Sequence, residues 1–134
     1  MARILVVEDE ANLRLLYRLE LGIEGHEIIE VGSGAEALAV LDQEKIDAAV
    51  LDLQLPDVWG LQLVDEMLSR QRDLPIIINT AYSQFRYDFH SWGADAFVVK
   101  SSDMSELRYA LERVLGESGK KVYRNGGVRE AVLV

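Results

Sequence analysis

The chain contains no cysteine among its 134 residues. Disulfide bonds and thiolate metal sites are therefore excluded, and the composition is compatible with a reducing compartment. Long hydrophobic runs are also missing, since no apolar stretch approaches the ~20 residues of a membrane-spanning helix. The first residues lead into a short apolar segment that lacks the organisation of a signal peptide. We therefore expect a cytoplasmic location and no association with membranes.

Basic residues are scarce as well. The chain has 14 Lys and Arg against 23 Asp and Glu, a formal net charge of −9 at pH 7. Binding to a nucleic-acid backbone requires clustered basic residues, so we expect no direct nucleic-acid binding by this chain. Hydrophobic residues make up 49% of the chain, which favours a folded protein over a disordered one. The length is that of one domain with a sizeable core.

Short apolar segments alternate with segments of helical periodicity. We expect strands over residues 3–7, 26–31, 46–51, 76–79 and 96–99. We expect helices over residues 11–21, around 37–41, around 61–68, over 83–92 and from about 102 to 115. This alternation predicts one doubly wound α/β domain over residues 1–116, with helices on both faces of a parallel sheet. Residues 117–134 are richer in basic than in acidic residues and contain an Asn-Gly-Gly turn signal, which indicates a C-terminal tail or linker remnant.

Polar side chains stand where the expected strands end. Glu8 and Asp9 follow the first strand, Asp52 the third, Thr80 the fourth and Lys100 the fifth. In a parallel α/β sheet, ligands bind beyond the carboxyl ends of the strands. We therefore expect these five side chains to meet at one edge of the sheet.

Three clustered carboxylates repel one another unless a cation lies between them. Oxygen ligands without His or Cys suit Mg²⁺, which binds a few carboxylates and keeps several waters. Such an ion, with the ammonium of Lys100 and the hydroxyl of Thr80, can neutralise a phosphoryl group, and phosphoryl transfer depends mainly on positioning and charge neutralisation. Neither a cysteine nor an activated Ser–His pair is evident, so Asp52 is the candidate nucleophile that would form an aspartyl phosphate.

Four segments resemble the signature segments of the response-regulator receiver domain of two-component (phosphorelay) signalling: ILVVEDE, VLDLQLPDVWG, INTAY and GADAFVVKS. The resemblance runs from about residue 3 to residue 116. It implies a (βα)5 flavodoxin-like fold with strand order 2-1-3-4-5, and phosphoryl transfer to Asp52 from a sensor histidine kinase or a phosphotransfer protein. The residues that it implies for Mg²⁺ are Glu8, Asp9, Asp52 and, through its backbone carbonyl, Gln54.

The same resemblance implies a switch. Thr80 and Lys100 would contact the phosphoryl oxygens, and Phe97 matches the switch aromatic, whose ring turns inward when the threonine moves. Gln54 and Tyr82 match positions that tune the lifetime of the phosphoryl group.

The resemblance also implies an output surface, formed by the last two expected helices and the strand between them. A downstream protein or output domain would bind there, or a second phosphorylated copy of the chain. Such a domain is not an enzyme in the usual sense, because it catalyses only its own phosphorylation and dephosphorylation.

Two positions depart from an ordinary pattern. Ser101 follows Lys100, where the family usually has proline after a cis peptide bond. A cis bond before a non-proline residue costs about 2.5–4 kcal/mol, so the sequence leaves open whether the bond is cis or trans. Trp59 places a large ring in the loop that should border the acidic site.

Three other functions are compatible with such a fold. A flavin carrier is disfavoured because the acidic residues 8–10 would repel the flavin phosphate. A haloacid-dehalogenase-like phosphatase would have a second acid two residues after the nucleophile, where this chain has Gln54. A degenerate receiver, which binds partners without phosphorylation, is opposed by the intact acceptor, metal and lysine positions.

Overall fold

The structure, a computed structural model, describes residues 1–116, so the tail or linker remnant expected over residues 117–134 lies outside the described residues. A five-stranded sheet forms the centre of the molecule. Its strands are β1 (Arg3–Val7), β2 (Glu27–Val31), β3 (Ala48–Leu51), β4 (Ile76–Thr80) and β5 (Ala96–Val99). The helices of the described range are α1 (Ala11–Gly22), α2 (Gly34–Gln43), α3 (Gly60–Arg70) and α4 (Ser105–Gly116), with the short 3₁₀ helices η1 (Ser83–Phe85) and η2 (Phe89–Trp92).

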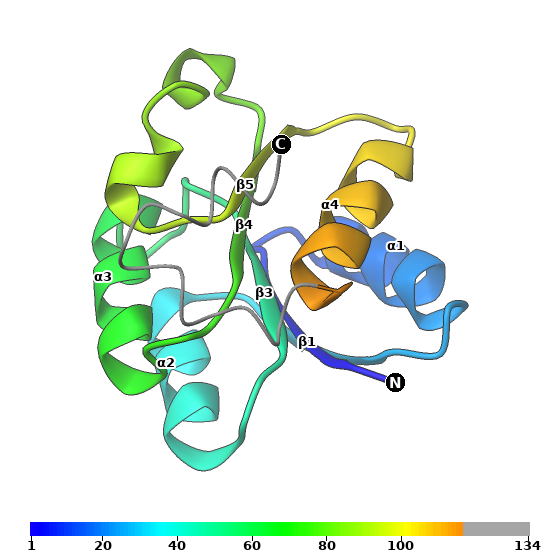
Figure 1. Cartoon of the computed structure of the whole chain (residues 1–134), viewed down its shortest axis with the longest axis horizontal. Coiled ribbons are helices and arrows are strands. Elements are labelled where there is room, and N and C mark those ends of the chain that lie inside the picture. Colours follow the sequence, from blue (N-terminus) through cyan, green and yellow to red (C-terminus); the bar gives the residue numbers. More distant parts are fainter. Residues whose placement is uncertain (117–134) are drawn as a thin grey trace.

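All neighbouring strands pair in parallel, in the order β2-β1-β3-β4-β5. This confirms the predicted doubly wound α/β sheet and its strand order. In Figure 1, α2 and α3 cover one face of the sheet, and α1 and α4 cover the other. Within the described residues, no helix is both long enough and apolar enough to cross a membrane.

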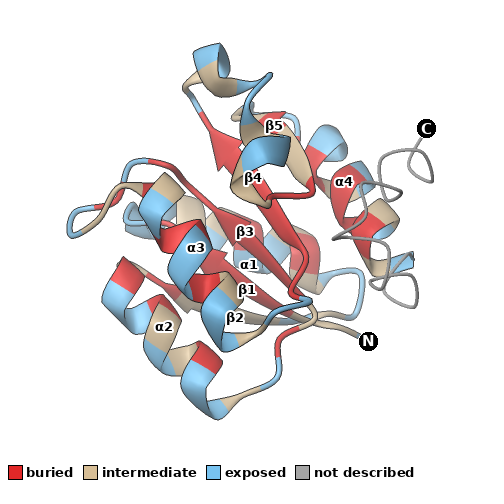
Figure 2. Cartoon of the chain, turned by 60° about the vertical axis from the view of Figure 1, so that its left-hand side comes forward, coloured by how far each residue is buried: buried red, intermediate tan, exposed pale blue. Residues whose placement is uncertain are grey.

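Two hydrophobic cores lie on the two faces of the sheet because side chains alternate along each strand. On β1, Leu5 and Val7 belong to the core beneath α2 and α3, whereas Ile4 and Val6 belong to the core beneath α1 and α4. The central strands β1, β3 and β4 are almost wholly buried, as the red ribbons of Figure 2 show. A parallel sheet between two helix layers requires this burial on both faces.

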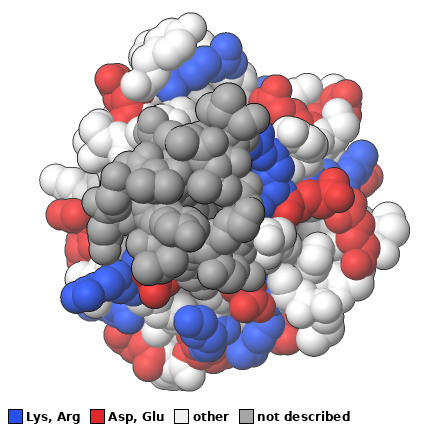
Figure 3. All heavy atoms as spheres, in the orientation of Figure 1, with Lys and Arg blue, Asp and Glu red and all other residues white. Residues whose placement is uncertain are grey.

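Charged side chains on the surface form pairs between elements. Arg108 on α4 contacts Glu20 at 3.1 Å and Glu24 at 3.5 Å, which joins α4 to the end of α1 and the turn after it. Figure 3 shows Lys and Arg interspersed with Asp and Glu over the described part of the visible face. Exposed pairs contribute only about 0–1 kcal/mol each, so the fold depends mainly on its two cores.

The α-helix predicted over residues 83–92 is wrong in type. This segment forms η1 and η2 with a turn between them, and neither of these short helices contains a buried residue. Its Ser, Asp, His and aromatic residues are weak helix formers, and Phe85, Phe89 and Trp92, which pack against the core, are only partly buried and do not compensate for this low propensity. Gly93 ends the segment with a φ of 91°, a left-handed conformation that glycine adopts easily.

The last helix begins later than predicted. The expected start lies at about residue 102, but α4 starts at Ser105, and the Asp103 carboxylate accepts a hydrogen bond from the Ser105 N–H at 2.9 Å. The Ser101 hydroxyl accepts one from the Asp103 N–H at 3.1 Å. These local side-chain bonds hold residues 101–104 in turns instead of a helix. Among residues 1–116 no peptide bond is cis, so the bond between Lys100 and Ser101 is trans.

Candidate functional site

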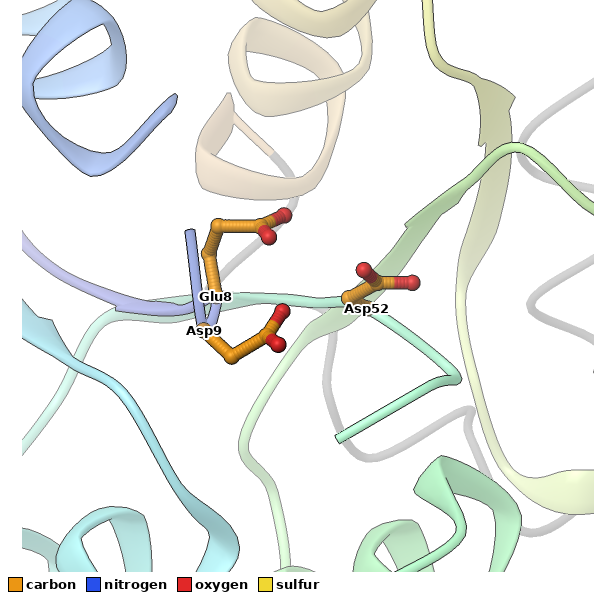
Figure 4. A group of neighbouring side chains, drawn as sticks. All are labelled: Glu8, Asp9 and Asp52. Carbon is orange, nitrogen blue, oxygen red and sulfur yellow. The ribbon is translucent and has the colours of Figure 1, made fainter. Parts of the chain in front are cut away.

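Three carboxylates meet at the carboxyl ends of β1 and β3. Since Val7 pairs with Leu51 in the parallel ladder, the residues that follow the two strands emerge side by side. One carboxylate oxygen from each of Glu8, Asp9 and Asp52 lies within 4.8 Å of the others. Figure 4 shows the carboxylates of Glu8 and Asp9 pointing to the side on which Asp52 lies. Glu8 and Asp52 are buried, at 2% and 7% exposure, whereas Asp9 is exposed.

Lys100 joins this acidic cluster from the end of β5. Its Nζ lies 2.8 Å from Glu8 Oε1 and 2.8 Å from Asp52 Oδ2. Burial alone would lower the pKa of Lys100, but hydrogen bonds and charge attraction from Asp52 and Glu8 outweigh burial and hold that pKa above its ordinary value. For Glu8 the balance is different, because burial raises its pKa against the opposing contact with Lys100. The lysine therefore stays charged at the centre of the site.

Thr80 ends β4, the strand between β3 and β5, and it is fully buried. Its backbone carbonyl accepts the Lys100 N–H at 2.8 Å, and its hydroxyl oxygen accepts the Tyr82 N–H at 3.3 Å. Phe97 lies on β5, partly buried, with its ring centroid 5.9 Å from that of Phe89. The residues predicted at the strand ends thus converge, and Phe97 lies on β5, three residues before Lys100.

The loop after β3 is held tightly. The Gly60 N–H donates to the Leu53 carbonyl at 2.7 Å, and a Cβ on Gly60 would lie 2.6 Å from Leu53 Cα and 2.8 Å from the Asp52 carbonyl oxygen. Only glycine fits such an approach. Inside the loop, Gln54 and Trp59 form an antiparallel bridge, and the Gln54 N–H donates to Asp52 Oδ1 at 3.3 Å.

Sequence reasoning missed the role of Asp57 in this loop. Its two carboxylate oxygens accept the N–H groups of Gly34 and Ala35, at 2.9 and 3.0 Å, where α2 begins. These bonds hold the pKa of Asp57 below its ordinary value. The contact ties the loop after β3 to the loop after β2. A Pro-Asp pair is an ordinary turn signal, so nothing local in the sequence points to this partner.

A second pair missed from the sequence lies behind the site. The Asn79 amide donates to the Tyr17 hydroxyl at 3.0 Å, and both residues are buried. Burial raises the pKa of the Tyr17 hydroxyl. The signal that could have found this pair is the position of Asn79 in a buried strand, because a buried polar side chain needs a hydrogen-bond partner.

A pocket of about 390 Å³ opens beside Asp52. The residues that line it are Asp9, Glu10, Asp52, Gln54, Leu55, Pro56, Ala81, Tyr82 and Lys100. Gln54 and Tyr82 contact each other there, since the Tyr82 hydroxyl donates a hydrogen bond to Gln54 Oε1. The two positions predicted to tune the phosphoryl group therefore lie together beside Asp52.

The donor set of the acidic cluster fits a magnesium ion. Mg²⁺ prefers oxygen ligands and is bound through few carboxylates, with water completing its shell. Glu8, Asp9 and Asp52 offer carboxylate oxygens within 4.8 Å of one another, and Asp9 faces solvent. Three of the four predicted metal residues, Glu8, Asp9 and Asp52, therefore form a cluster that could bind a metal ion.

Comparisons with known proteins agree with this geometry. The family model of the response regulator receiver domain matches residues 4–112. The chain is 39% identical over 118 residues to the two-component response regulator PhoP of Pseudomonas aeruginosa, covering 87% of this chain and 52% of that protein. It is 34% identical over 125 residues to a probable transcriptional regulator, ycf27, of Porphyridium aerugineum, covering 92% and 52%. The chain thus spans about half the length of these curated relatives.

Solved structures are similar as well. The response regulator TrrA from Thermotoga maritima in complex with Mg²⁺-BeF has 42% sequence identity and a TM-score of 0.80, with 86% of this chain and 100% of that chain covered. TrrA in complex with the histidine kinase ThkA has 42% identity and a TM-score of 0.79, with 86% and 99% covered. Because the family match spans all five strands and includes the acidic cluster and its lysine, the chain belongs to the response regulator receiver domains of two-component systems.

Proposed function

We propose that this domain is a phosphorylation switch in which Asp52 accepts a phosphoryl group from the phosphohistidine of a sensor histidine kinase or a phosphotransfer protein. The observation that carries the proposal is the convergence of Asp52 with Glu8, Asp9 and Lys100 beside an open pocket. Two structures of one relative support it: TrrA is known in complex with Mg²⁺-BeF and in complex with a histidine kinase.

The transfer moves one phosphoryl group between two nucleophiles. A carboxylate oxygen of Asp52 attacks phosphorus, and the phosphorus–nitrogen bond of the phosphohistidine breaks. The imidazole nitrogen keeps the electron pair and takes a proton from solvent. Lys100, now 2.8 Å from Asp52 Oδ2, and the hydroxyl of Thr80 would then contact the phosphoryl oxygens.

Magnesium fits this reaction. Its ligands would be Glu8, Asp9, Asp52 and the backbone carbonyl of Gln54. When bound, the ion supplies positive charge that neutralises the phosphoryl oxygens. The Gln54 N–H donates a hydrogen bond to Asp52 Oδ1. This bond holds the Asp52 carboxylate close to the residue whose backbone carbonyl would be the fourth ligand.

The switch would start at Thr80. Its hydroxyl accepts the Tyr82 N–H, so a movement of Thr80 toward a phosphoryl group pulls on the segment that holds η1 and η2. The ring of Phe97 lies against Phe89 of η2, and a change in that segment therefore reaches Phe97. A groove of about 410 Å³ between η2, β5 and α4 is the candidate output surface.

The partner at the output surface would be a downstream protein, an output domain or a second phosphorylated copy of the chain. The curated relatives are about twice as long as this chain, which agrees with a receiver that acts on an output domain. We place the switch in the cytoplasm, acting on no separate substrate. Light scattering with and without beryllofluoride tests the homodimer, and an unchanged mass contradicts it.

Intact-mass spectrometry after incubation with acetyl phosphate tests the acceptor. With Mg²⁺ we expect one phosphoryl adduct on the wild type, and none with EDTA or on Asp52→Asn. Asp57→Asn is the matched control, since Asp57 lies in the same loop but outside the acidic cluster, and we expect it to be labelled like the wild type. A folded wild type without an adduct, beside a control receiver that is labelled, would favour a binding module that works without phosphorylation.

A further inference from the structure

Trp59 occupies the N-cap position of α3, where its side chain makes no capping hydrogen bond. Ser, Thr, Asp and Asn are preferred at this position because their side chains accept an N–H from the first helical turn. Tryptophan therefore costs α3 stability. A residue that breaks a local rule in this way is often placed for a functional contact, and Trp59 lies in the loop after β3, which begins with Asp52.

The ring of Trp59 contacts the segment on the other side of the pocket. It meets Tyr82 edge-on, with ring centroids 6.4 Å apart at an interplanar angle of 60°, and Phe85 in the same way at 5.7 Å and 68°. Its backbone bridges to Gln54. Trp59 therefore contacts both members of the hydrogen-bonded pair of Tyr82 and Gln54.

The backbone at Trp59 is held firmly, whereas the segment that begins at Tyr82 depends on contacts with neighbouring residues for its position. The residue after Trp59 is Gly60, whose backbone packs against Leu53 with no room for a Cβ. By contrast, η1, which follows Tyr82 directly, contains no buried residue. Aromatic edge-to-face contacts stabilise such a segment. The ring of Trp59 is thus a fixed support for Tyr82.

We propose that Trp59 is a positioning residue that prolongs the life of a phosphoryl group on Asp52 by holding the Tyr82 hydroxyl on Gln54. The inference rests on the proposed function of Asp52. In hydrolysis, a water oxygen attacks phosphorus and the bond between phosphorus and the Asp52 oxygen breaks. The carboxylate keeps the electron pair, one proton of the water stays on the orthophosphate formed, and the other passes to an orthophosphate oxygen or to solvent.

The Tyr82–Gln54 pair slows this step in two ways. Both side chains line the pocket through which water reaches Asp52. Gln54 Oε1 is also the acceptor that could orient an attacking water, and the Tyr82 hydroxyl occupies it. Loss of the support from Trp59 frees Gln54 Oε1 and opens the pocket.

The test is the rate at which the phosphoryl adduct decays. Each protein is labelled with acetyl phosphate and Mg²⁺, desalted, and followed by intact-mass spectrometry. We expect Trp59→Asn and Tyr82→Phe each to decay roughly two- to tenfold faster than the wild type, the change expected from one lost hydrogen bond. We expect Trp59→Phe to keep a decay rate close to that of the wild type, because it retains an aromatic edge.

The variant Trp59→Asn distinguishes a positioning role of Trp59 from a merely structural one. Asparagine supplies the N-cap that α3 lacks, so we expect a helix that is no less stable by thermal unfolding together with a faster decay. Trp59→Leu, which supplies no cap, should decay as fast as Trp59→Asn. The double variant Trp59→Asn with Tyr82→Phe should decay no faster than either single variant, because both remove the same contact.

Two variants serve as matched controls. Trp92→Leu removes the other tryptophan whose ring contacts Phe85. Tyr87→Phe removes a hydroxyl from a residue that is 90% exposed. Both should decay like the wild type. If the adduct decayed at the wild-type rate in Trp59→Asn and Trp59→Leu, or if the two effects added in the double variant, this inference would be overturned and the proposed function would stand. Absence of any adduct on the wild type would overturn the proposed function and this inference with it.

Discussion

Replacing Lys100 with methionine removes the cation that holds the acidic cluster together. Lys100 Nζ lies 2.8 Å from both Glu8 Oε1 and Asp52 Oδ2. The two carboxylate side chains are only 2% and 8% exposed, so water cannot solvate them fully once the ammonium is gone. Methionine keeps most of the apolar contacts of the lysine side chain, and the change is therefore mainly one of charge.

The size of the effect follows from these distances. At an effective dielectric constant of about 20, each contact contributes roughly 6 kcal/mol of attraction. The cost of burying the ammonium offsets a large part of this attraction. Removing one partner of a buried pair costs about 3–5 kcal/mol, because the remaining charge is left without compensation. We expect the free energy of unfolding of Lys100→Met to fall by this amount when no divalent cation is present.

Urea unfolding with EDTA and with MgCl₂ measures this change. Mg²⁺ at a hundred times its dissociation constant should return about 2.7 kcal/mol, because it binds only the folded cluster. Lys45→Met is the matched control, since Lys45 is exposed. A loss below about 1 kcal/mol, the value of an exposed pair, would refute the reasoning. The reasoning would also be refuted if MgCl₂ did not raise the free energy of unfolding of Lys100→Met above its value in EDTA.

Three further predictions concern the supports of the site. Asp57→Ala should cost about 1 kcal/mol near neutral pH, as the loss of a cap does. The N–H partners of Asp57 lower its pKa in the folded state. Its contribution to stability is therefore fully present above the ordinary pKa of about 3.9 and is lost as the pH falls through the folded-state pKa. Urea unfolding should show the same stability for the wild type and Asp57→Ala only in strong acid. Gly60→Ala, which puts a Cβ 2.6 Å from backbone, should cost about 1–3 kcal/mol in the same assay. Gly22→Ala, with nothing within 4 Å, should change stability by less than about 1 kcal/mol. Tyr17→Phe leaves the Asn79 amide unpaired and should cost about 1–3 kcal/mol; an unchanged melting temperature would contradict it.

The strands and the site were readable from the sequence because both depend on short-range patterns. Apolar runs at residues 4–7 and 48–51 are too short for helices, and an acidic residue follows each of them, at the edge where ligands bind. The convergence of Asp52 and Lys100 followed from parallel strands alone. The strand order came from the family resemblance instead, since nothing in the strand sequences distinguishes one neighbour from another.

The features that the sequence did not reveal depend on contacts between distant residues. Asp57 binds an N–H group 23 residues away, and Asn79 binds Tyr17 across 62 residues. The segment over residues 83–92 has aromatic residues at helical spacing, yet their rings pack on Trp59 and Phe97 from 3₁₀ turns. Periodicity describes which side chains share a face, but it cannot show whether enough surface is buried to hold an α-helix.

A phosphoryl group on Asp52, as proposed, would compete with Glu8 for Lys100. The Lys100 ammonium is already shared equally between the two carboxylates, and phosphorylation adds about 1.5–2 negative charges on one side of it. The Lys100 backbone N–H is bonded to the Thr80 carbonyl, and the Thr80 hydroxyl to the Tyr82 N–H. A shift in charge balance at Asp52 therefore reaches the segment after Tyr82 through these two hydrogen bonds, one to the Thr80 carbonyl and one to its hydroxyl. Because η1 and η2 contain no buried residue, we expect that segment to change its conformation at low cost.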